Sequence, residues 1–302
     1  MTGEQRNGIN RLAVRVDSSP KVGYGHLMRV NVLARKFLQH GCDITYLTRT
    51  SSAVSKTSPS QVNVYQLSER EVEETLNWLE IHEPGALLTD SYMIDTPYQR
   101  KLCESVPILI TVTDDTRFTL CSDVNINGNI HATELDYNWI GEKPEMLLGT
   151  DYLLIRDEFQ RLADEDPPWR DPPEQALITF GGSDVNSVTP DIIYSFDGFE
   201  LEVNVVIGPG FSNETEIIKA ARKTDANFNL LREPENLPRL MFDADFAVSA
   251  VGNTVYELLL TGTPVIGIPQ SNNQLPIFEE LSSRDAINAI EINSDVSVDE
   301  FI

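Results

Sequence analysis

The segment Arg15-Val-Asp-Ser-Ser-Pro-Lys-Val-Gly-Tyr-Gly-His-Leu-Met-Arg29 carries the most information in this chain. It follows a short apolar run at residues 12–16, which predicts a strand, and it opens a helical pattern at residues 26–39. Gly23 and Gly25 occupy the turn, where the missing side chains let the backbone approach a ligand. Free N–H groups at a helix start attract anions, so this order predicts an α/β unit with a phosphate site.

The glycine turn matches no standard nucleotide motif. It is not a Walker A loop, because no Gly-Lys-Ser/Thr follows, and Arg29 stands where G-x-G-x-x-G requires its third glycine. His26 falls at the first helical position, near the expected place of a pyrophosphate. A loop with a capping histidine explains the same spacing, so the residues alone leave both interpretations open.

Strand and helix patterns alternate along the whole chain, which predicts parallel sheets built from right-handed crossover units. The expected strands are residues 12–16, 43–47, 62–65, 86–89, 108–112, 124–127, 175–180, 201–207, 228–231, 246–249, 265–268 and 288–292. The expected helices are residues 26–39, 69–81, 96–105, 214–223, 253–260 and 276–281, with another from Asn186.

The proline-rich and charged segment 164–174 interrupts this alternation, because it suits neither helix nor strand. We expect it to link a domain at residues 11–163 to a second at residues 175–302. The fold class is therefore α/β, with two Rossmann-like doubly wound domains and a ligand cleft between them. The spacing of Ser297 and Glu300 matches a capping box, which predicts the beginning of a helix near the end of the given sequence, so truncation is one interpretation of this end.

The amino-acid composition argues against some classes of function, nucleic-acid binding above all. The chain has 302 residues, with 23 Lys plus Arg against 47 Asp plus Glu and a formal net charge of −24. Such a surface repels phosphate backbones, so we expect no nucleic-acid partner. Lysine is nearly absent, and an acidic, lysine-poor surface is typical of proteins that stay soluble in molar salt. We interpret the charge as adaptation to salt, as in a halophilic protein.

Cysteine use and hydropathy indicate the compartment. Cys42, Cys103 and Cys121 are widely spaced and form neither a metal motif nor a disulfide framework. Residues 1–10 lack the apolar core of a signal peptide, and no apolar run approaches the roughly 20 residues of a membrane span. We therefore expect a soluble, cytoplasmic protein without a membrane span. The sequence indicates no oligomeric state.

The second half repeats the order of strand, glycine turn and helix. Residues 180–186, with Gly182 and Ser183, suit backbone contact to phosphate. Residues 249–257 place Glu257 one turn into a helix, where it is either a ribose ligand or a solvated carboxylate. The amides of residues 269–274 are either turn formers or sugar ligands.

Seven motifs in order carry a family resemblance. They are residues 15–29, Asp90-Ser-Tyr92, Asp114-Asp115, Leu148-Gly149-(x)2-Tyr152-(x)3-Arg156-(x)2-Phe159, Gly181-Gly-Ser-Asp184, Gly252-Asn-Thr254 with Glu257, and Asn273-Gln274. Together they resemble the UDP-sugar hydrolases of the pseudaminic-acid pathway, a family that includes spore-coat polysaccharide biosynthesis proteins and belongs to the GT-B nucleotide-sugar group. The resemblance covers residues 11–292 and implies a GT-B-like arrangement of the two domains.

The resemblance implies metal-independent hydrolysis, without a cofactor, of a UDP-linked 2,4-diacetamido-trideoxy sugar to UDP and free sugar. His26 would be the base that activates the attacking water, and Tyr92 would line the sugar or uracil side of the cleft. The nucleotide would lie on Gly252–Glu257, and the sugar or its N-acetyl groups on Asn273 and Gln274. The expected substrate-binding residues are Gly23, Gly25, Tyr92, Gly182, Ser183, Gly252, Asn253, Thr254, Glu257, Asn273 and Gln274.

Two other function classes fit the same motifs. A glycosyltransferase would use the same fold and donor with an acceptor hydroxyl in place of water, and a non-catalytic subunit would only bind the nucleotide sugar. No basic, apolar patch for a membrane acceptor stands out, and a mere binder has no need of His26, so we favour hydrolysis. Ser91 departs from the family, which often has histidine between the Asp and Tyr of this motif.

Overall fold

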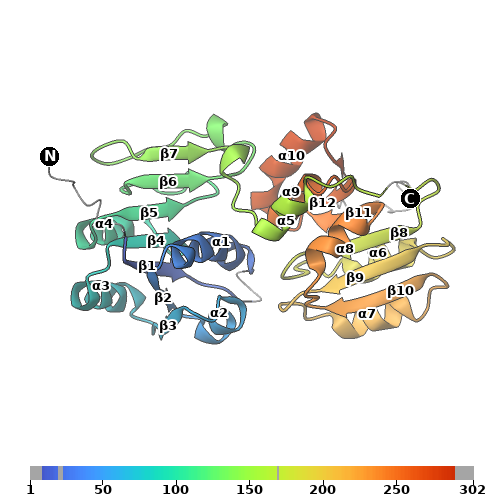
Figure 1. Cartoon of the computed structure of the whole chain (residues 1–302), viewed down its shortest axis with the longest axis horizontal. Helices are drawn as coiled ribbons and strands as arrows, with labels where there is room; N and C mark the ends of the chain where they lie inside the picture. The colour runs from blue at the N-terminus through green and yellow to red at the C-terminus, as the bar shows by residue number, and fades with distance from the viewer. Residues whose placement is uncertain (1–8, 20–22, 169, 290–302) are drawn as a thin grey trace. The chain divides into compact units, whose positions relative to one another are not determined.

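The computed structural model describes residues 9–19, 23–168 and 170–289 (Figure 1). The contacts divide them into two compact units, the first formed by residues 9–19 and 26–154 and the second by residues 23–25 and 155–289. The division at Leu154 and Ile155 lies earlier in the chain than the linker that we predicted at residues 164–174. That segment is part of the second unit, because Arg170 Nη1 donates to Asp245 Oδ1 over 2.9 Å.

The first unit is a seven-stranded parallel sheet in the order β3-β2-β1-β4-β5-β6-β7, and the order reverses between β1 and β4. Its strands are β1 Arg11–Val16, β2 Asp43–Thr48, β3 Asn63–Gln66, β4 Ala86–Asp90, β5 Leu109–Val112, β6 Val124–Asn127 and β7 Glu145–Leu148. Its helices are α1 Gly25–Gln39, α2 Ser51–Thr57, α3 Glu71–His82 and α4 Thr96–Ser105, with the 3-10 turns η1 Ala132–Glu134 and η2 Thr150–Tyr152.

Helices cover both faces of this sheet (Figure 1). Leu12, Val14 and Val16 of β1 pack in one core cluster with α1 and α2, because alternate side chains of a strand share a face. Ala13, which points the other way, joins a second cluster with α3 and α4. The doubly wound arrangement leaves the carboxyl ends of β1 and β4 at the switch point, where open α/β sheets bind ligands.

The second unit repeats this order in six parallel strands, β10-β9-β8-β11-β12-β13. Its strands are β8 Gln175–Thr179, β9 Glu202–Ile207, β10 Asn227–Arg232, β11 Phe246–Ala250, β12 Val265–Ile268 and β13 Asn288–Ala289. Its helices are α5 Asp157–Leu162, α6 Thr189–Ser195, α7 Glu214–Ala221, α8 Leu237–Asp243, α9 Asn253–Leu260 and α10 Leu275–Ser283, with the 3-10 turn η3 Asn272–Gln274. One face of the sheet packs on α6 and α7 through a cluster that includes Phe196 and Ile217.

Four elements were missing from the sequence prediction: α2, β7, α5 and α8. Each is short, and α2 buries only Val54, so its pattern is too weak to be read as a helix. The helix predicted from Asn186 begins at Thr189, because the Asp184 carboxylate accepts from the backbone N–H groups of Val188 and Thr189. Residues 290–292 of the last predicted strand and the capping box at Ser297 lie outside the described residues.

The predicted α/β class with two Rossmann-like, doubly wound halves is confirmed. The cleft between the halves stays a prediction. Of the helices that the structure describes, none combines the length and the apolar character required to cross a bilayer.

Candidate functional site

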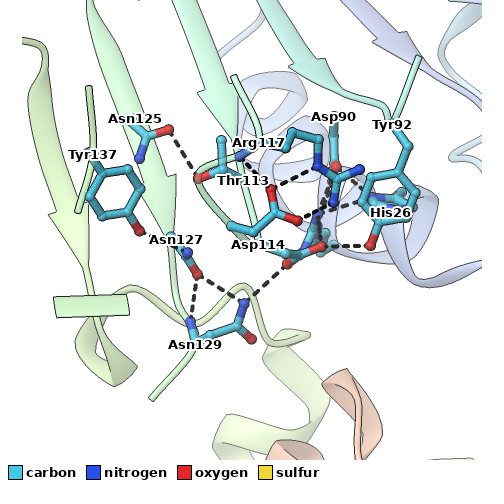
Figure 2. A network of polar contacts seen from close by, with 12 residues as sticks. His26, Asp90, Tyr92, Thr113, Asp114, Arg117, Asn125, Asn127, Asn129 and Tyr137 are labelled. Carbon is cyan, nitrogen blue, oxygen red and sulfur yellow. Dashed lines mark hydrogen bonds and ion pairs between the residues drawn. The ribbon is translucent and has the colours of Figure 1, made fainter. Parts of the chain in front are cut away.

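Four charged or titratable side chains meet at the carboxyl edge of the first sheet (Figure 2). α1 follows β1 and supplies His26 and, one helical turn later, Arg29 on the same face. β4 ends at Asp90, and Asp114 follows the end of β5. All four gather beside the switch point between β1 and β4, so the topology places them where a ligand is expected.

His26 is held by Asp90. Its Nδ1 atom lies 2.6 Å from Asp90 Oδ1, and both side chains are buried. Arg29 Nη2 also lies 3.0 Å from Nδ1, but the contact to Asp90 is shorter. Because an ionised carboxylate only accepts hydrogen bonds, we assign the imidazole proton to Nδ1. The lone pair then lies on Nε2, which has no hydrogen-bond partner within the described part of the chain. This is the tautomer of a general base.

Arg29 joins Asp90 to Asp114. Its Nε and Nη2 atoms donate to Asp90 Oδ2 and Oδ1 over 2.5 Å and 2.7 Å. Its Nη1 donates to Asp114 Oδ1, and its Nη2 also lies 3.1 Å from Asp114 Oδ2. Burial by itself would raise the pKa of each carboxyl, but the Arg29 and His26 charges outweigh it and lower the pKa of both. Both carboxylates are therefore ionised around neutral pH.

Tyr92 forms an aromatic wall beside the imidazole. Its ring meets the His26 ring edge to face, with centroids 4.3 Å apart, and its hydroxyl donates to Asp114 Oδ2 over 3.2 Å. The Arg117 guanidinium lies 3.9 Å from the centroid of the Tyr92 ring. Burial and the Asp114 charge raise the pKa of Tyr92 to about 12, so its hydroxyl stays protonated and remains a donor.

A polar chain continues from this cluster along the sheet edge (Figure 2). Asn129 Nδ2 donates to Asp114 Oδ1 over 3.1 Å and to Asn127 Oδ1 over 2.9 Å. The Asn127 amide in turn donates to the Tyr137 hydroxyl over 2.9 Å. Asp114 is thus held from β6 as well as from α1.

Sequence reasoning placed His26 and Tyr92 in the site but assigned no role to their partners. The missed residues are Arg29, Asp90, Asp114, Arg117 and Asn129. Two signals were available: an acidic residue lies at the end of one buried strand (Asp90) and just after the end of the next (Asp114), and Arg29 stands three residues after His26 on one helix. Gly23, with φ of +88°, and Gly25 lie where the chain enters α1.

In the second unit, glycines allow loops to approach one another at the second switch point, between β8 and β11. A Cβ atom on Gly208 would lie 2.3 Å from the Gly181 carbonyl oxygen, and one on Gly181 would lie 3.1 Å from Thr254 Oγ1. The Ser183 Oγ atom is buried and makes no hydrogen bond with any described residue. Gly252 precedes Asn253, the first residue of α9. The predicted phosphate-binding loop at residues 180–186 therefore lies close to the second one, at residues 249–257.

Several side chains that we predicted to bind the substrate form hydrogen bonds with other residues of the protein. Arg156 Nε donates to Glu257 Oε1 over 3.0 Å, and burial raises the pKa of Glu257 against the opposing Arg156 charge. Gln274 Oε1 accepts from the backbone N–H groups of Val251 and Gln270 over 3.2 Å and 2.9 Å. The Asn273 side-chain oxygen accepts from the Ser271 hydroxyl. Gln274 and Gly252 are therefore close, with Glu257 one turn further along α9.

No protein-family model matches the chain. The chain is 26% identical to the UDP-2,4-diacetamido-2,4,6-trideoxy-beta-L-altropyranose hydrolase of Campylobacter jejuni. The match spans 256 residues, which are 83% of this chain and 88% of that protein. The chain is 22% identical to the spore coat polysaccharide biosynthesis protein SpsG of Bacillus subtilis, over 87% of this chain and 78% of that protein. An uncharacterized protein of Methanocaldococcus jannaschii is 23% identical over 89% of this chain, which spans only 58% of that protein.

The resemblance that the motifs indicated is thus confirmed at low identity and over most of the chain. The fold is similar to that of MurG from Acinetobacter baumannii, with a TM-score of 0.63, 10% identity and coverage of 96% of this chain and 88% of MurG. A UDP-L-rhamnose complex of Arabidopsis thaliana UGT89C1 has a TM-score of 0.61 at 12% identity, over 95% and 86% of the two chains. These neighbours confirm the GT-B-like fold class.

The described residues contain no group of three or more His, Cys, Asp or Glu side chains placed to hold a metal ion. The chemistry available at this site is that of an imidazole fixed by a carboxylate. Such a pair takes a proton from a nucleophile and is able to return it later.

Proposed function

We propose that this protein is a UDP-sugar hydrolase that releases UDP and a free 2,4-diacetamido-trideoxy sugar. The observation that carries the proposal is the 2.6 Å contact between His26 Nδ1 and Asp90 Oδ1, which leaves Nε2 as a base. The name of the C. jejuni relative supplies the substrate class. The name of the B. subtilis relative supports a place in surface polysaccharide biosynthesis. Nonulosonic acid biosynthesis and a cytoplasmic location are part of the proposal and rest on the motifs and the composition.

The proposed reaction requires a single base and no second catalytic group. Nε2 of His26 takes a proton from water as the water oxygen bonds to the anomeric carbon, and the bond from that carbon to the diphosphate oxygen breaks. Asp90 stabilises the imidazolium that forms, since it accepts the Nδ1 proton. UDP leaves as an anion and requires no strong general acid. A positioned base contributes about 100- to 10,000-fold to the rate.

We propose that the second unit binds the nucleotide. Backbone N–H groups of Gly182 and Ser183 and the start of α9 at Gly252, Asn253 and Thr254 would contact the diphosphate. Glu257 would bind ribose through the carboxylate oxygen that Arg156 Nε does not contact. Asn273 and the Gln274 amide nitrogen would contact the sugar. Gly23 and Gly25 would let the backbone approach it at the start of α1, and Tyr92 would line its place beside His26.

A glycosyltransferase is the second candidate, because the similar folds include a glycosyltransferase of Rickettsia africae and UGT89C1 in complex with UDP-L-rhamnose. The same base would then deprotonate an acceptor hydroxyl instead of water. The named sequence relative is a hydrolase and spans most of the chain, so it favours hydrolysis.

The test is turnover of UDP-2,4-diacetamido-2,4,6-trideoxy sugars by the protein and by His26→Asn, with and without added acceptor sugars. We expect UDP release without an acceptor, a loss of about 100- to 10,000-fold in His26→Asn, and unchanged UDP affinity by calorimetry. His40→Asn is the matched control, since His40 is exposed at the end of α1. Near-normal turnover in His26→Asn would remove the proposed mechanism, and release only with an acceptor would favour the transferase.

A further inference from the structure

Asp114 connects three side chains around the candidate base: Arg29, Tyr92 and Asn129. It accepts from Arg29 through both carboxylate oxygens, from the Tyr92 hydroxyl over 3.2 Å and from Asn129 Nδ2 over 3.1 Å. These donors come from α1, from the loop after β4 and from the loop after β6. No hydrogen bond between described residues joins Asp114 to His26, so Asp114 acts on the imidazole through other residues and through its charge.

We propose that Asp114 is a positioning residue: by holding Arg29 and Tyr92 at once, it sets the orientation of the His26–Asp90 pair and of the aromatic wall beside the imidazole. The proposal rests on the hydrolase function, because it assigns a role in that reaction to a residue that does not touch the substrate.

The first arm of this arrangement is Arg29. Asp90 Oδ1 is shared by His26 and Arg29 Nη2, so the guanidinium plane determines where that oxygen lies. A guanidinium bound along one edge is still able to pivot, whereas Arg29 is bound by Asp90 and by Asp114. Fixing the guanidinium therefore fixes the carboxylate that orients the imidazole.

The second arm is Tyr92. Its ring packs edge to face on His26 and beneath the Arg117 guanidinium, and its hydroxyl ends on Asp114. The raised pKa of Tyr92 keeps this hydroxyl a donor. Asp114 therefore holds the ring that packs against the base. Asn129 in turn restricts Asp114 from the β6 side.

The charge of Asp114 adds a third effect. Two carboxylates, Asp90 and Asp114, face one guanidinium, Arg29, so the cluster around the imidazole carries one net negative charge. Arg117 lies over the Tyr92 ring and is paired with Asp115, so this pair adds no net charge. A net negative charge stabilises the imidazolium that forms when His26 takes a proton. Loss of the Asp114 charge would remove that stabilisation.

The experiment compares Asp114→Asn with Asp151→Asn, an exposed carboxylate of the same unit, and confirms folding of both by circular dichroism. We expect kcat for UDP release to fall about 10- to 100-fold in Asp114→Asn, with KM changed less than about threefold. The acidic limb of the kcat profile should move to lower pH, because the variant lacks a negative charge near the imidazole. Asp151→Asn should match the wild type in all three measurements.

Nitrogen NMR of labelled histidine gives a readout that does not depend on turnover, and the chain has only four histidines. We expect the His26 signals of Asp114→Asn to show a changed proton distribution between Nδ1 and Nε2, and those of Asp151→Asn to stay as in the wild type. If the wild type releases no UDP, the proposed function fails while this measurement still tests the positioning of His26.

Two further variants keep the proposal testable if Asp114→Asn does not fold. Asn129→Ala removes one contact to Asp114 and should lower kcat about three- to tenfold. Tyr92→Phe removes the hydroxyl but no charge, so it should lower kcat without moving the acidic limb. Unchanged kcat and unchanged His26 signals in folded variants would overturn the proposal. A rise in KM alone would also overturn it, since Asp114 would then serve binding.

Discussion

Replacement of Asp90 by asparagine tests the base assignment most directly. The carboxylate accepts from His26 Nδ1 over 2.6 Å and from Arg29 Nε and Nη2 over 2.5 Å and 2.7 Å. Asparagine keeps the shape but turns one oxygen into an NH2 donor. Toward Arg29 Nε, that donor would face another donor at close range. Toward His26, that donor would face Arg29 Nη2 at 2.7 Å, but this contact is longer and Nη2 still reaches Asp114 Oδ2. The conflict with Nδ1 is relieved when the imidazole moves its proton to Nε2.

The second arrangement is the less costly one, and it blocks the base because Nε2 then carries the proton. We therefore expect kcat in Asp90→Asn to fall by about 1,000- to 10,000-fold, close to the loss in His26→Asn. UDP affinity should stay unchanged. The stability cost should be about 1–3 kcal/mol, less than the 3–5 kcal/mol typical of an orphaned buried charge, because Arg29 keeps Asp114.

The assay is UDP release under saturating substrate, with calorimetric UDP titration and urea unfolding on the same samples. Asp151→Asn serves again as the exposed carboxylate control. A folded Asp90→Asn protein with kcat within about threefold of the wild type would refute the reasoning, because the imidazole would then not depend on Asp90 for its tautomer.

The remaining predictions concern binding, packing, acid and salt. Glu257→Ala should weaken UDP binding about tenfold in calorimetry while kcat persists, because its hydrogen bonds are made equally in ground and transition states; unchanged affinity would exclude Glu257 from the site. Gly208→Ala should lower the free energy of unfolding by about 1–3 kcal/mol, since its Cβ would meet the Gly181 carbonyl oxygen at 2.3 Å. Gly85→Ala, whose Cβ would meet nothing closer than 3.6 Å, should cost less. The lowered pKa of Asp114 means that its contribution to stability is present above the ordinary carboxyl pKa of about 4 and is lost as pH falls through the lower folded value. Acid unfolding of Asp114→Asn should therefore have a weaker pH dependence below about pH 4 than that of the wild type. Thermal midpoints should rise from dilute buffer to molar KCl, since a net charge of −24 repels itself until salt screens it; a flat trend would contradict salt adaptation.

Local sequence determined the α/β class and most of the elements. The predicted helices at residues 96–105 and 253–260 and the strands at residues 124–127 and 265–268 have the bounds found in the structure. Periodicity and turn residues act within a few positions of one another, so a single sequence contains this information. Short polar elements such as α2 were missed because their stability comes from packing on other elements.

The candidate site was predictable only in part. His26 stood out because it follows two glycines at a helix start, and Tyr92 because of the motif around it. The partners of His26 were not predictable from spacing, since Asp90 lies 64 residues away along the chain and Asp114 lies 85 residues from Arg29. Parallel crossover connections bring the carboxyl ends of β1, β4 and β5 to one edge of the sheet, and only there do these charges become neighbours.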